Sequence, residues 1–393
     1  MLDFNKKEQC YSCSACYSIC PKSAIKMIQN DEGFLNPKVE EENCIKCGLC
    51  EKVCPVLDDS KLKKQNDNQK IFSLIRKDYS DKTNYTSAGV FYSLTKAFIN
   101  EGGYVVGCIW DDNMVAKHVV TNKIEIAKKM SGSKYVQSDL NDVFKQIKLL
   151  LKSNKKVLFS GTACQIDGLK KYIGNDNLNL FLFEIICHGC PSPKVLKLYF
   201  DDIQQKYKSK VVSANFRYKG KYGWITPMSY IKLENGKTLE QLAFTDNSYV
   251  VGFANDLFHK NSCYSCKYKG NEFVGDITVG DFWGCKTIDL NQSKNNGISE
   301  LICNNGKGEY LLSLIIDKFF VKYYLLSDAK KENLAIYCAP NRNSNRKKYF
   351  ELINHKEKYS KKYIFNYKIR VKSLLNKFGI FQKIKLKKYR SNH

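Results

Sequence analysis

The sequence lacks several features that would place it in common protein classes. No apolar run approaches the roughly 18 to 20 residues that span a bilayer, and Lys6 and Lys7 stand where a signal peptide would become apolar. No G-x-G-x-x-G or G-x-x-x-x-G-K-S/T pattern occurs, so neither a Rossmann nor a P-loop fingerprint indicates nucleotide binding. We therefore expect a cytoplasmic protein without either of these nucleotide sites.

Cysteine, by contrast, is abundant, with 17 residues, and eight of them form two copies of Cys-x2-Cys-x2-Cys-x3-Cys-Pro. In bacterial two-cluster ferredoxins this spacing holds two [4Fe-4S] clusters, and the fourth cysteine of each copy completes the other cluster. Zinc sites need four ligands and rarely place a third cysteine at the same interval. The predicted ligand sets are therefore crossed, with Cys10, Cys13, Cys16 and Cys54 on one cluster and Cys44, Cys47, Cys50 and Cys20 on the other.

The net charge of +25 raises the question of a nucleic-acid partner. Residues 341–393 contain 17 lysines and arginines against two glutamates, so 15 of these charges lie in the last 53 residues. Iron–sulfur clusters add negative charge that the formal count omits. Charge therefore does not predict a nucleic-acid partner. A basic, amphipathic helix within residues 363–388 has two interpretations, a helix packed on the domain or one lying on an anionic membrane surface.

The chain divides into four parts. A ferredoxin module over residues 1–57 is followed by a polar linker over 58–70, a larger domain over 71–340 and the basic helical tail over 341–393. Apolar periodicity predicts helices over 84–100, from the caps Ser138 and Asp139 to 152, and over 165–173. Strands are expected over 104–110, 155–160 and 180–187, and residues 211–281 are expected to be rich in sheet. This alternation predicts an α/β domain with a mixed sheet, fused to an α+β ferredoxin module.

Six further cysteines lie at turns or strand ends, where a fold can assemble a scattered site. They are Cys164, Cys187, Cys190, Cys263, Cys266 and Cys285. Cys187 and Cys190 form one Cys-x2-Cys pair, and Cys263 and Cys266 form another. Spacing alone does not choose four ligands among the six. Cys108, Cys303 and Cys338 stand alone and are interpreted as small buried side chains, while His118 and His188 are interpreted as structural.

Five segments resemble the coenzyme F-420 hydrogenase/dehydrogenase beta subunit family in its bacterial form with a fused two-cluster ferredoxin domain. They are GSKYVQSDL, LFSGTACQIDGLK, ICHGCPSPKV, FRYKGKYGW and CYSCKYKG…GDITVGDFWG. The resemblance implies an α/β flavoprotein domain that holds FAD beside a third [4Fe-4S] cluster. It maps the third set of ligands onto Cys164, Cys187, Cys263 and Cys266, with Cys190 and Cys285 as the rivals. Ala163 stands where the family usually has proline, and Cys190 where it usually has valine.

The resemblance also places FAD near three turns. The implied cofactor-binding residues are Ser87, Gly89, Ser133, Lys134, Tyr135, Gln137, Gly161, Thr162 and Gln165. Small side chains and backbone amides at such turns suit a pyrophosphate, and a lysine adds positive charge. Without the resemblance, ordinary turns with a solvated lysine would be the preferred explanation of these segments. Arg217, Lys219 and Trp224 either flank a substrate pocket or belong to an ordinary strand.

Together these features predict an iron–sulfur flavoprotein oxidoreductase that links a ferredoxin-type carrier to an organic substrate. The substrate is a deazaflavin coenzyme or a sugar or lipid-linked compound, the latter through a connection of such genes with surface-polysaccharide synthesis. No acid or base is assigned. The alternative is a non-catalytic subunit that passes electrons to a separate enzyme.

Overall fold

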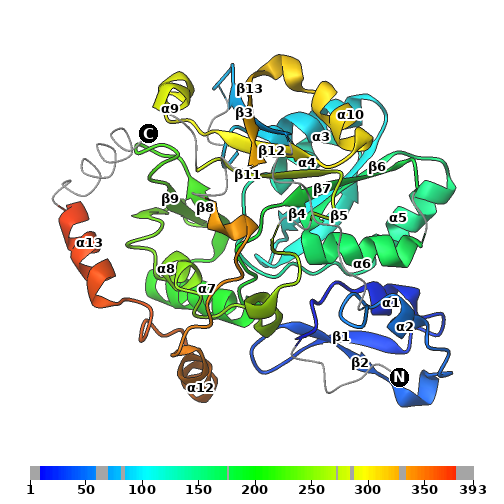
Figure 1. Ribbon diagram of the computed structural model, residues 1–393. Helices are drawn as coiled ribbons and strands as arrows, with labels where there is room; N and C mark the ends of the chain where they lie inside the picture. Colours follow the sequence, from blue (N-terminus) through cyan, green and yellow to red (C-terminus); the bar gives the residue numbers. More distant parts are fainter. Residues whose placement is uncertain are drawn as a thin grey trace.

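An eight-stranded mixed sheet forms the centre of the molecule in the computed structural model (Figure 1). The structure describes residues 9–58, 70–80, 85–174, 177–270, 273–283, 287–326 and 333–377. The strand order is β13-β3-β12-β11-β7-β6-β4-β5, and β4, β6, β7 and β11 run parallel. Their bounds are β3 Lys70–Arg76, β4 Tyr104–Trp110, β5 Ala116–Thr121, β6 Val157–Thr162, β7 Leu180–Ile185, β11 Ile277–Asp281, β12 Ser299–Cys303 and β13 Phe319–Leu325.

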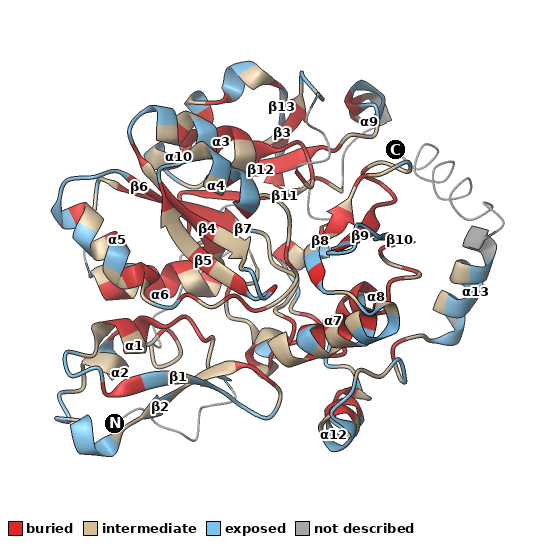
Figure 2. Ribbon diagram, turned by 180° about the vertical axis from the view of Figure 1, so that it is seen from behind, coloured by how far each residue is buried: buried red, intermediate tan, exposed pale blue. Residues whose placement is uncertain are grey.

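Helices cover both faces of this sheet because its strands alternate apolar side chains between the two sides. On one face, Val105, Leu158 and Phe181 pack beneath α3 (Val90–Asn100), α4 (Ile124–Met130) and α10 (Gly306–Ser313). Their sequence neighbours Val106 and Phe159 face α5 (Val143–Lys152) and α6 (Ala163–Ile173) on the other. The central strands β6, β7 and β12 are therefore almost entirely buried, whereas the edge strands β5 and β13 are partly exposed or intermediate (Figure 2).

A second, smaller layer contains the antiparallel sheet β10-β9-β8, with β8 Val211–Tyr218, β9 Met228–Leu233 and β10 Thr238–Leu242. It shares one apolar core with α7 (Pro193–Tyr207), α8 (Ser248–Ala254) and the C-terminal α12 (Arg346–Lys356). From α12, Tyr349, Phe350 and Ile353 are buried in that core. The chain continues into α13 (Tyr367–Lys377), and α9 (Thr287–Ser293) packs against β3 of the large sheet. The first part of the basic tail is thus a structural element of the large domain.

The N-terminal module contains the antiparallel hairpin of β1 (Ile25–Gln29) and β2 (Leu35–Val39) beside α1 (Ala15–Ile19) and α2 (Leu49–Lys52). It lies against α6 and α5, so its first cysteine motif faces the large domain (Figure 1). Contact is close, because a Cβ on Gly168 of α6 would lie 2.7 Å from the Cys13 sulfur.

These elements agree with the predicted fold class of a ferredoxin-like module fused to an α/β domain with a mixed sheet. The strand predicted over 104–110 has those bounds, and the strands predicted over 155–160 and 180–187 and the helix predicted over 165–173 lie within two residues of β6, β7 and α6. Two predicted helices begin later than expected, and the first of them, predicted over 84–100, begins only at Val90. The helix expected from Ser138 begins only at Val143, because Asp139 instead pairs with Lys117 in an isolated bridge. The stretch 211–281 is rich in sheet as expected, with β8, β9, β10 and β11, and it also contains the short helix α8. Among the described residues, no helix is long and apolar enough to cross a membrane.

Candidate functional site

The two ferredoxin-like motifs fold alike. In each motif, the residues two after the first cysteine and one after the second adopt the left-handed backbone region, with φ of 57° and 61° at Ser12 and Ser14 and of 52° and 72° at Lys46 and Gly48. Such conformations cost energy at non-glycine positions and persist where the surroundings determine them. Because the same two positions adopt this backbone conformation in both motifs, the two loops have a similar shape, as expected if both bind the same kind of group.

The crossed grouping of cysteines is visible in the geometry. One small cavity, about 30 Å³ in volume, is lined by Cys20 from the first motif together with Cys44, Cys47 and Cys50 from the second. In the other group, Cys10 and Cys54 both raise the pKa of the buried Cys13 and Cys16 thiols, after burial itself. The structure therefore brings together each of the two predicted ligand sets.

A third group of cysteines gathers at the carboxyl ends of the parallel strands. β6 ends at Thr162 and turns directly into α6, which carries Cys164 at its second position, and Thr162 caps this helix in a box with Gln165. β7 ends two residues before Cys187, and the 3-10 helix Asn261–Ser265 carries Cys263. Carboxyl strand ends in a parallel sheet are the usual place for a ligand site. The resulting cavity has a volume of about 110 Å³ and is lined by Cys164, Cys187, Cys190, Cys263 and Cys266.

The four mapped thiols lie close enough to influence one another. Burial raises the pKa of Cys263 to about 12, with Cys187 and Cys266 contributing as neighbouring negative charges. The pKa of Cys164 is raised by burial and by the other three, and that of Cys266 by burial and Cys187. A bound cationic metal would reverse this balance by stabilising the thiolates. Four convergent, half-buried cysteines around one cavity therefore fit an iron–sulfur cluster.

The structure describes only one of the two alternative ligands predicted for the third cluster, Cys190. Cys190 lines the same cavity, and its backbone N–H donates to the Cys263 sulfur at 3.3 Å, so geometry keeps it beside the mapped set. Cys285 lies outside the described residues. Of the lone cysteines, Cys108 and Cys303 are half-buried as whole residues and Cys338 is exposed, so a buried side chain is wrong for Cys338.

A larger cavity, about 580 Å³ in volume, adjoins the third thiol group and shares Thr162, Gln165, Cys187 and Cys190 with it. Eight of the nine residues expected to bind FAD line this cavity, namely Ser87, Gly89, Ser133, Lys134, Tyr135, Gly161, Thr162 and Gln165. The ninth, Gln137, lines the thiol cavity, and its Oε1 accepts a hydrogen bond from the Leu35 N–H of the N-terminal module at 2.8 Å.

The Lys134 side chain does not point its charge freely into the cavity, as would be expected of a residue that binds a phosphate. The Lys134 ammonium donates to the carbonyls of Lys129, Met130 and Ser131 at the end of α4, and burial lowers its pKa to about 8. It is therefore not the solvated lysine of an ordinary turn, and its hydrogen bonds point to the backbone. Gly89 begins α3 at the cavity edge with φ of 79°, where a Cβ would also meet the Tyr85 ring at 2.8 Å.

On the far side of this cavity, a buried guanidinium lies among aromatic rings. Arg217 is 5% exposed, with Nη2 at 3.0 Å from Asp281 Oδ2 and Nη1 at 3.3 Å from the Tyr135 hydroxyl. Its charge lies over the Trp283 ring at 5.4 Å. Trp224 Nε1 donates to the same aspartate at 2.6 Å but does not line the cavity. Of the three residues singled out in FRYKGKYGW, only Arg217 therefore reaches the cavity.

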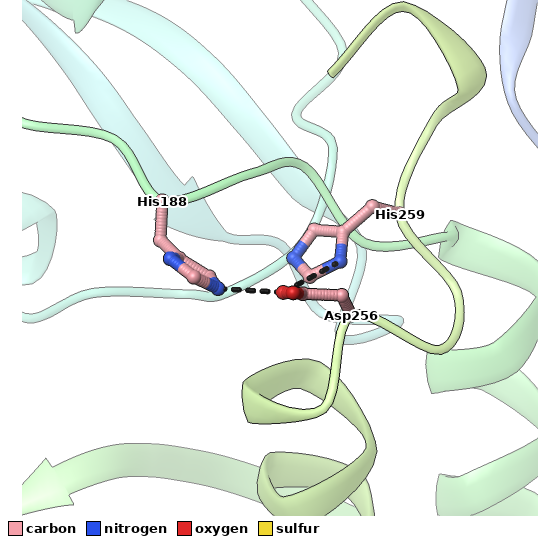
Figure 3. Close-up of side chains that lie close together, drawn as sticks. All are labelled: His188, Asp256 and His259. Atoms are coloured by element: carbon pink, nitrogen blue, oxygen red, sulfur yellow. Dashed lines mark hydrogen bonds and ion pairs between the residues drawn. The ribbon is translucent and has the colours of Figure 1, made fainter. Parts of the chain in front are cut away.

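Two histidines lie on either side of Asp256 (Figure 3), and His188 lines both cavities. His188, next to Cys187, forms a 2.7 Å hydrogen bond from Nε2 to Asp256 Oδ1, and the buried His259 ring places Nδ1 at 3.8 Å from the same oxygen. Burial lowers the pKa of His259 to about 3, so it is neutral. His118 is also buried and bonds to the Ser160 carbonyl at 3.0 Å, in agreement with a structural role.

Comparison with known proteins agrees with this geometry. Residues 154–327 match the family model for the C-terminal part of the coenzyme F420 hydrogenase/dehydrogenase beta subunit, and residues 4–62 match a 4Fe-4S dicluster domain. Over residues 154–327, the large domain is therefore similar to this beta subunit family. The chain is related to hydrogenase and dehydrogenase subunits, and it is an iron–sulfur protein of electron transfer.

One solved structure to which the chain is similar is the F420-reducing [NiFe] hydrogenase complex from Methanosarcina barkeri. The sequence identity is 16%, the TM-score is 0.45, and the match covers 70% of this chain and 93% of the other. No curated protein matches the chain.

Sequence reasoning missed two features of this region. Asp281 and Trp283 stand in the GDFWG segment, but only the fold shows that they face Arg217. Lys260 lines the thiol cavity and reaches into the N-terminal module. Its one sequence signal is a position three residues before Cys263, which does not reveal where its side chain points.

Proposed function

We propose that this protein is an iron–sulfur flavoprotein oxidoreductase with three [4Fe-4S] clusters and one FAD. The observation that carries the proposal is that three thiol groups and a 580 Å³ cavity adjoin one another in series, with Cys16 of one N-terminal group packed against Cys20 and Cys50 of the other. When bound, the clusters would supply one-electron transfer, and FAD would exchange those electrons in pairs with an organic substrate.

Contacts between the groups support a series rather than separate sites. Tyr11 and Ser12, between Cys10 and Cys13, line the thiol cavity of the large domain. The hydroxyl of Ser262, next to Cys263, donates to the Cys10 carbonyl at 3.1 Å. On the opposite side, Thr162 Oγ1 lies 3.2 Å from the Cys164 sulfur, and Thr162 also lines the large cavity. The large-domain thiol group is thus in contact with the Cys10 group of the N-terminal module on one side and with the 580 Å³ cavity on the other.

Two features favour FAD as occupant of the large cavity. The N-terminal ends of α3 and α6 both open on it, and free backbone N–H groups at helix starts stabilise phosphate charge. The remaining wall contains Tyr135, Phe253 and Trp283, which offer flat apolar surface to an aromatic ring system. The backbone would therefore bind the pyrophosphate, because the Lys134 ammonium is already engaged.

We propose a ferredoxin-type protein as the electron partner and a small molecule, either a deazaflavin coenzyme or a sugar or lipid-linked compound, as substrate. The N-terminal module, which matches a 4Fe-4S dicluster domain, supports a ferredoxin-type partner. Arg217 on the cavity wall supports a polar substrate. The alternative remains a subunit that transfers electrons without its own substrate. Bound flavin that is reduced by ferredoxin but turns over no small molecule would favour that alternative.

Anaerobic analysis of iron, sulfide and flavin tests the cofactor set. We expect about twelve iron atoms per chain, from four per cluster, and one FAD. Cys187→Ser should lower the content to about eight, whereas Cys190→Ser should leave about twelve. Loss of iron only from Cys190→Ser would make Cys190 the ligand. A wild-type content of about eight, unchanged by Cys187→Ser, would contradict the third cluster.

A further inference from the structure

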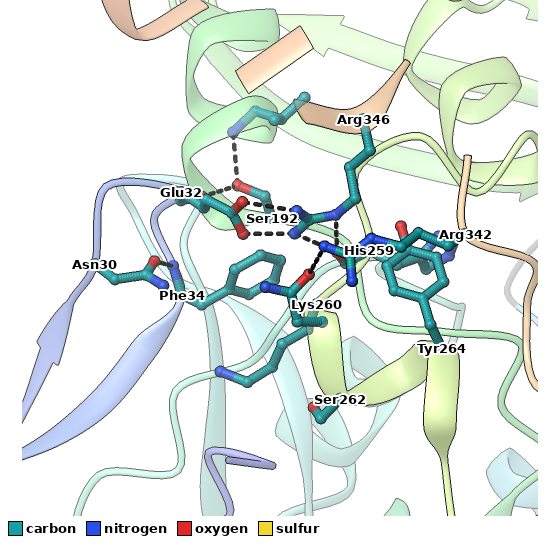
Figure 4. A network of polar contacts seen from close by, with 12 residues as sticks. Asn30, Glu32, Phe34, Ser192, His259, Lys260, Ser262, Tyr264, Arg342 and Arg346 are labelled. Atoms are coloured by element: carbon teal, nitrogen blue, oxygen red, sulfur yellow. Dashed lines mark hydrogen bonds and ion pairs between the residues drawn. The ribbon is translucent and has the colours of Figure 1, made fainter. Parts of the chain in front are cut away.

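Lys260 connects two of the thiol groups directly. Its main chain belongs to the large-domain site, because its N–H donates to the Cys190 carbonyl at 2.9 Å and its own carbonyl accepts from the Cys263 N–H at 3.0 Å. Its side chain enters the N-terminal module, where the ammonium donates to the Ser12 hydroxyl, to Asn36 Oδ1 at 2.9 Å and to the Leu35 carbonyl at 3.4 Å. Figure 4 shows this side chain beside Phe34 and Ser262.

The ammonium is buried among neutral groups. Lys260 is 4% exposed, its hydrogen-bond acceptors are a hydroxyl, an amide oxygen and a carbonyl, and its charge lies 5.0 Å from the centre of the Phe34 ring. Within the described ranges, no carboxylate forms an ion pair with it. A buried cation without a counter-charge is costly. Thiols that can carry negative charge act on it from both sides, Cys10 from the module and Cys164, Cys190 and Cys263 from the large domain, and the last three line the same cavity as Lys260.

We propose that Lys260 is the shared counter-charge of two iron–sulfur sites, the one held by Cys10, Cys13, Cys16 and Cys54 and the one held by the large-domain cysteines, and that it makes both easier to reduce. The inference rests on the three-cluster function proposed above. An added electron makes a cluster more negative, and a fixed positive charge in a low-dielectric interior stabilises that reduced form more than the oxidised one. Placed between two sites, one lysine raises both reduction potentials together.

The remaining site, that of Cys20, Cys44, Cys47 and Cys50 in the N-terminal module, serves as an internal control. Among the described residues, none from the segment around Lys260 lines the cavity of Cys20, Cys44, Cys47 and Cys50. The charge of Lys260 should therefore act on two clusters and have little effect on the third.

The test is an anaerobic redox titration of the full-length protein followed by electron paramagnetic resonance. Lys260→Gln removes the charge but keeps a hydrogen-bond donor, Lys260→Met removes both, and Lys260→Arg keeps the charge. Lys307→Met is the matched control, because this partly buried lysine also donates to neutral carbonyls, those of Asn177 and Leu180, at the opposite end of β7. We expect both neutral variants to lower the potentials of two clusters and leave the third unchanged, while Lys260→Arg and Lys307→Met resemble the wild type.

Three results would overturn the proposal. They are unchanged potentials in both neutral variants, an equal shift of all three clusters, or the same shift in Lys260→Arg. Loss of iron from both neutral variants but not from Lys260→Arg would support the need for the charge, and loss from all three would show a purely structural role. Wild-type iron of about eight atoms would instead remove the three-cluster function and this inference with it, so the two failures are distinguishable.

Discussion

Gly168 and Cys13 join the two halves of the molecule in one contact: a Cβ built on Gly168 would lie 2.7 Å from both the Cβ and the sulfur of Cys13. Gly168 is buried in the middle of α6, four residues after Cys164. A residue that is normally unfavourable within a helix is thus required where the N-terminal module approaches the helix.

Gly168→Ala should therefore destabilise the protein although alanine favours helices. The helix gain of roughly 0.5–1 kcal/mol is outweighed by an overlap with backbone-fixed atoms that costs about 1–3 kcal/mol. We expect a lower Tm and easier proteolysis between the modules. Gly306→Ala, at the start of α10 with open space around its Cβ, is the control and should have no such effect. An unchanged Tm for Gly168→Ala would show that the modules do not depend on this contact.

A second tie between the modules is the ion pair of Arg346 with Glu32 (Figure 4). Arg346 is 3% exposed, and its two terminal nitrogens contact both carboxylate oxygens, one at 2.7 Å, while it also donates to the His259 carbonyl. Breaking a buried pair from one side costs about 3–5 kcal/mol. Arg346→Gln should lower the free energy of unfolding by an amount of that order, measured by denaturant titration.

The exposed pair of Lys347 and Glu351 on the same helix serves as the control, with side chains 89% and 62% exposed. Lys347→Gln should change the free energy of unfolding by less than about 1 kcal/mol. Equal effects of the two substitutions would contradict a locking role for Arg346.

Glu300 predicts part of the pH dependence of stability. It is fully buried on β12, one carboxylate oxygen accepts from Asn333 Nδ2 at 3.2 Å, and burial raises its pKa to about 7. Because the unfolded carboxyl ionises at a lower pH, the folded state binds the extra proton between about pH 4 and 7. Its contribution to stability is therefore complete below that range and is lost as the pH rises through it.

Glu300→Gln should remove this loss. We expect the variant to be more stable than the wild type at pH 8 by an amount on the order of 1 to 3 kcal/mol, with the difference shrinking towards pH 5. Thermal unfolding across this range measures it. A parallel pH dependence of the two proteins would show that Glu300 does not ionise in the folded state.

The sequence allowed the ferredoxin-like sites to be predicted because their ligands lie within one short segment, where spacing controls geometry. The third site could be predicted only in outline. Its cysteines come from strand ends and loops up to about a hundred residues apart, and both Cys187 and Cys190 reach the cavity. The partners of Lys134 and Gln137 could not be predicted, because a local pattern does not show which backbone carbonyl or which module a side chain meets.

The basic tail shows the same limit. Apolar periodicity over 363–388 predicts a helix without indicating what its apolar face contacts, and residues 378–388 lie outside the described residues. At the start of this range, Ile364 is buried in the core of the large domain, and Phe365 and Ile369 pack against it. In α13, however, Tyr367, Val371 and Leu374 are 82%, 37% and 56% exposed on successive turns, beside the exposed Arg370.

We propose that this α13 face contacts an anionic membrane surface. Co-sedimentation with vesicles rich in anionic lipid should retain the full-length protein at low salt and less of it as salt is raised. Replacing Tyr367, Val371 and Leu374 together by serine should weaken retention. Leu149→Ser, which removes a similarly exposed leucine from α5, should not. If the full-length protein does not co-sediment with such vesicles at low salt, α13 does not bind membranes and serves only in packing.

The central claim is that electrons from a ferredoxin-type donor reach the flavin through the large-domain thiol site. Stopped-flow mixing of a reduced ferredoxin with the flavin-loaded full-length protein, without oxygen, follows flavin bleaching directly. Cys263→Ser should keep its FAD and its two N-terminal clusters, yet lose rapid bleaching, while Cys190→Ser bleaches like the wild type. If Cys263→Ser, shown to lack the third cluster, bleaches as fast as the wild type, the proposed series of sites is wrong.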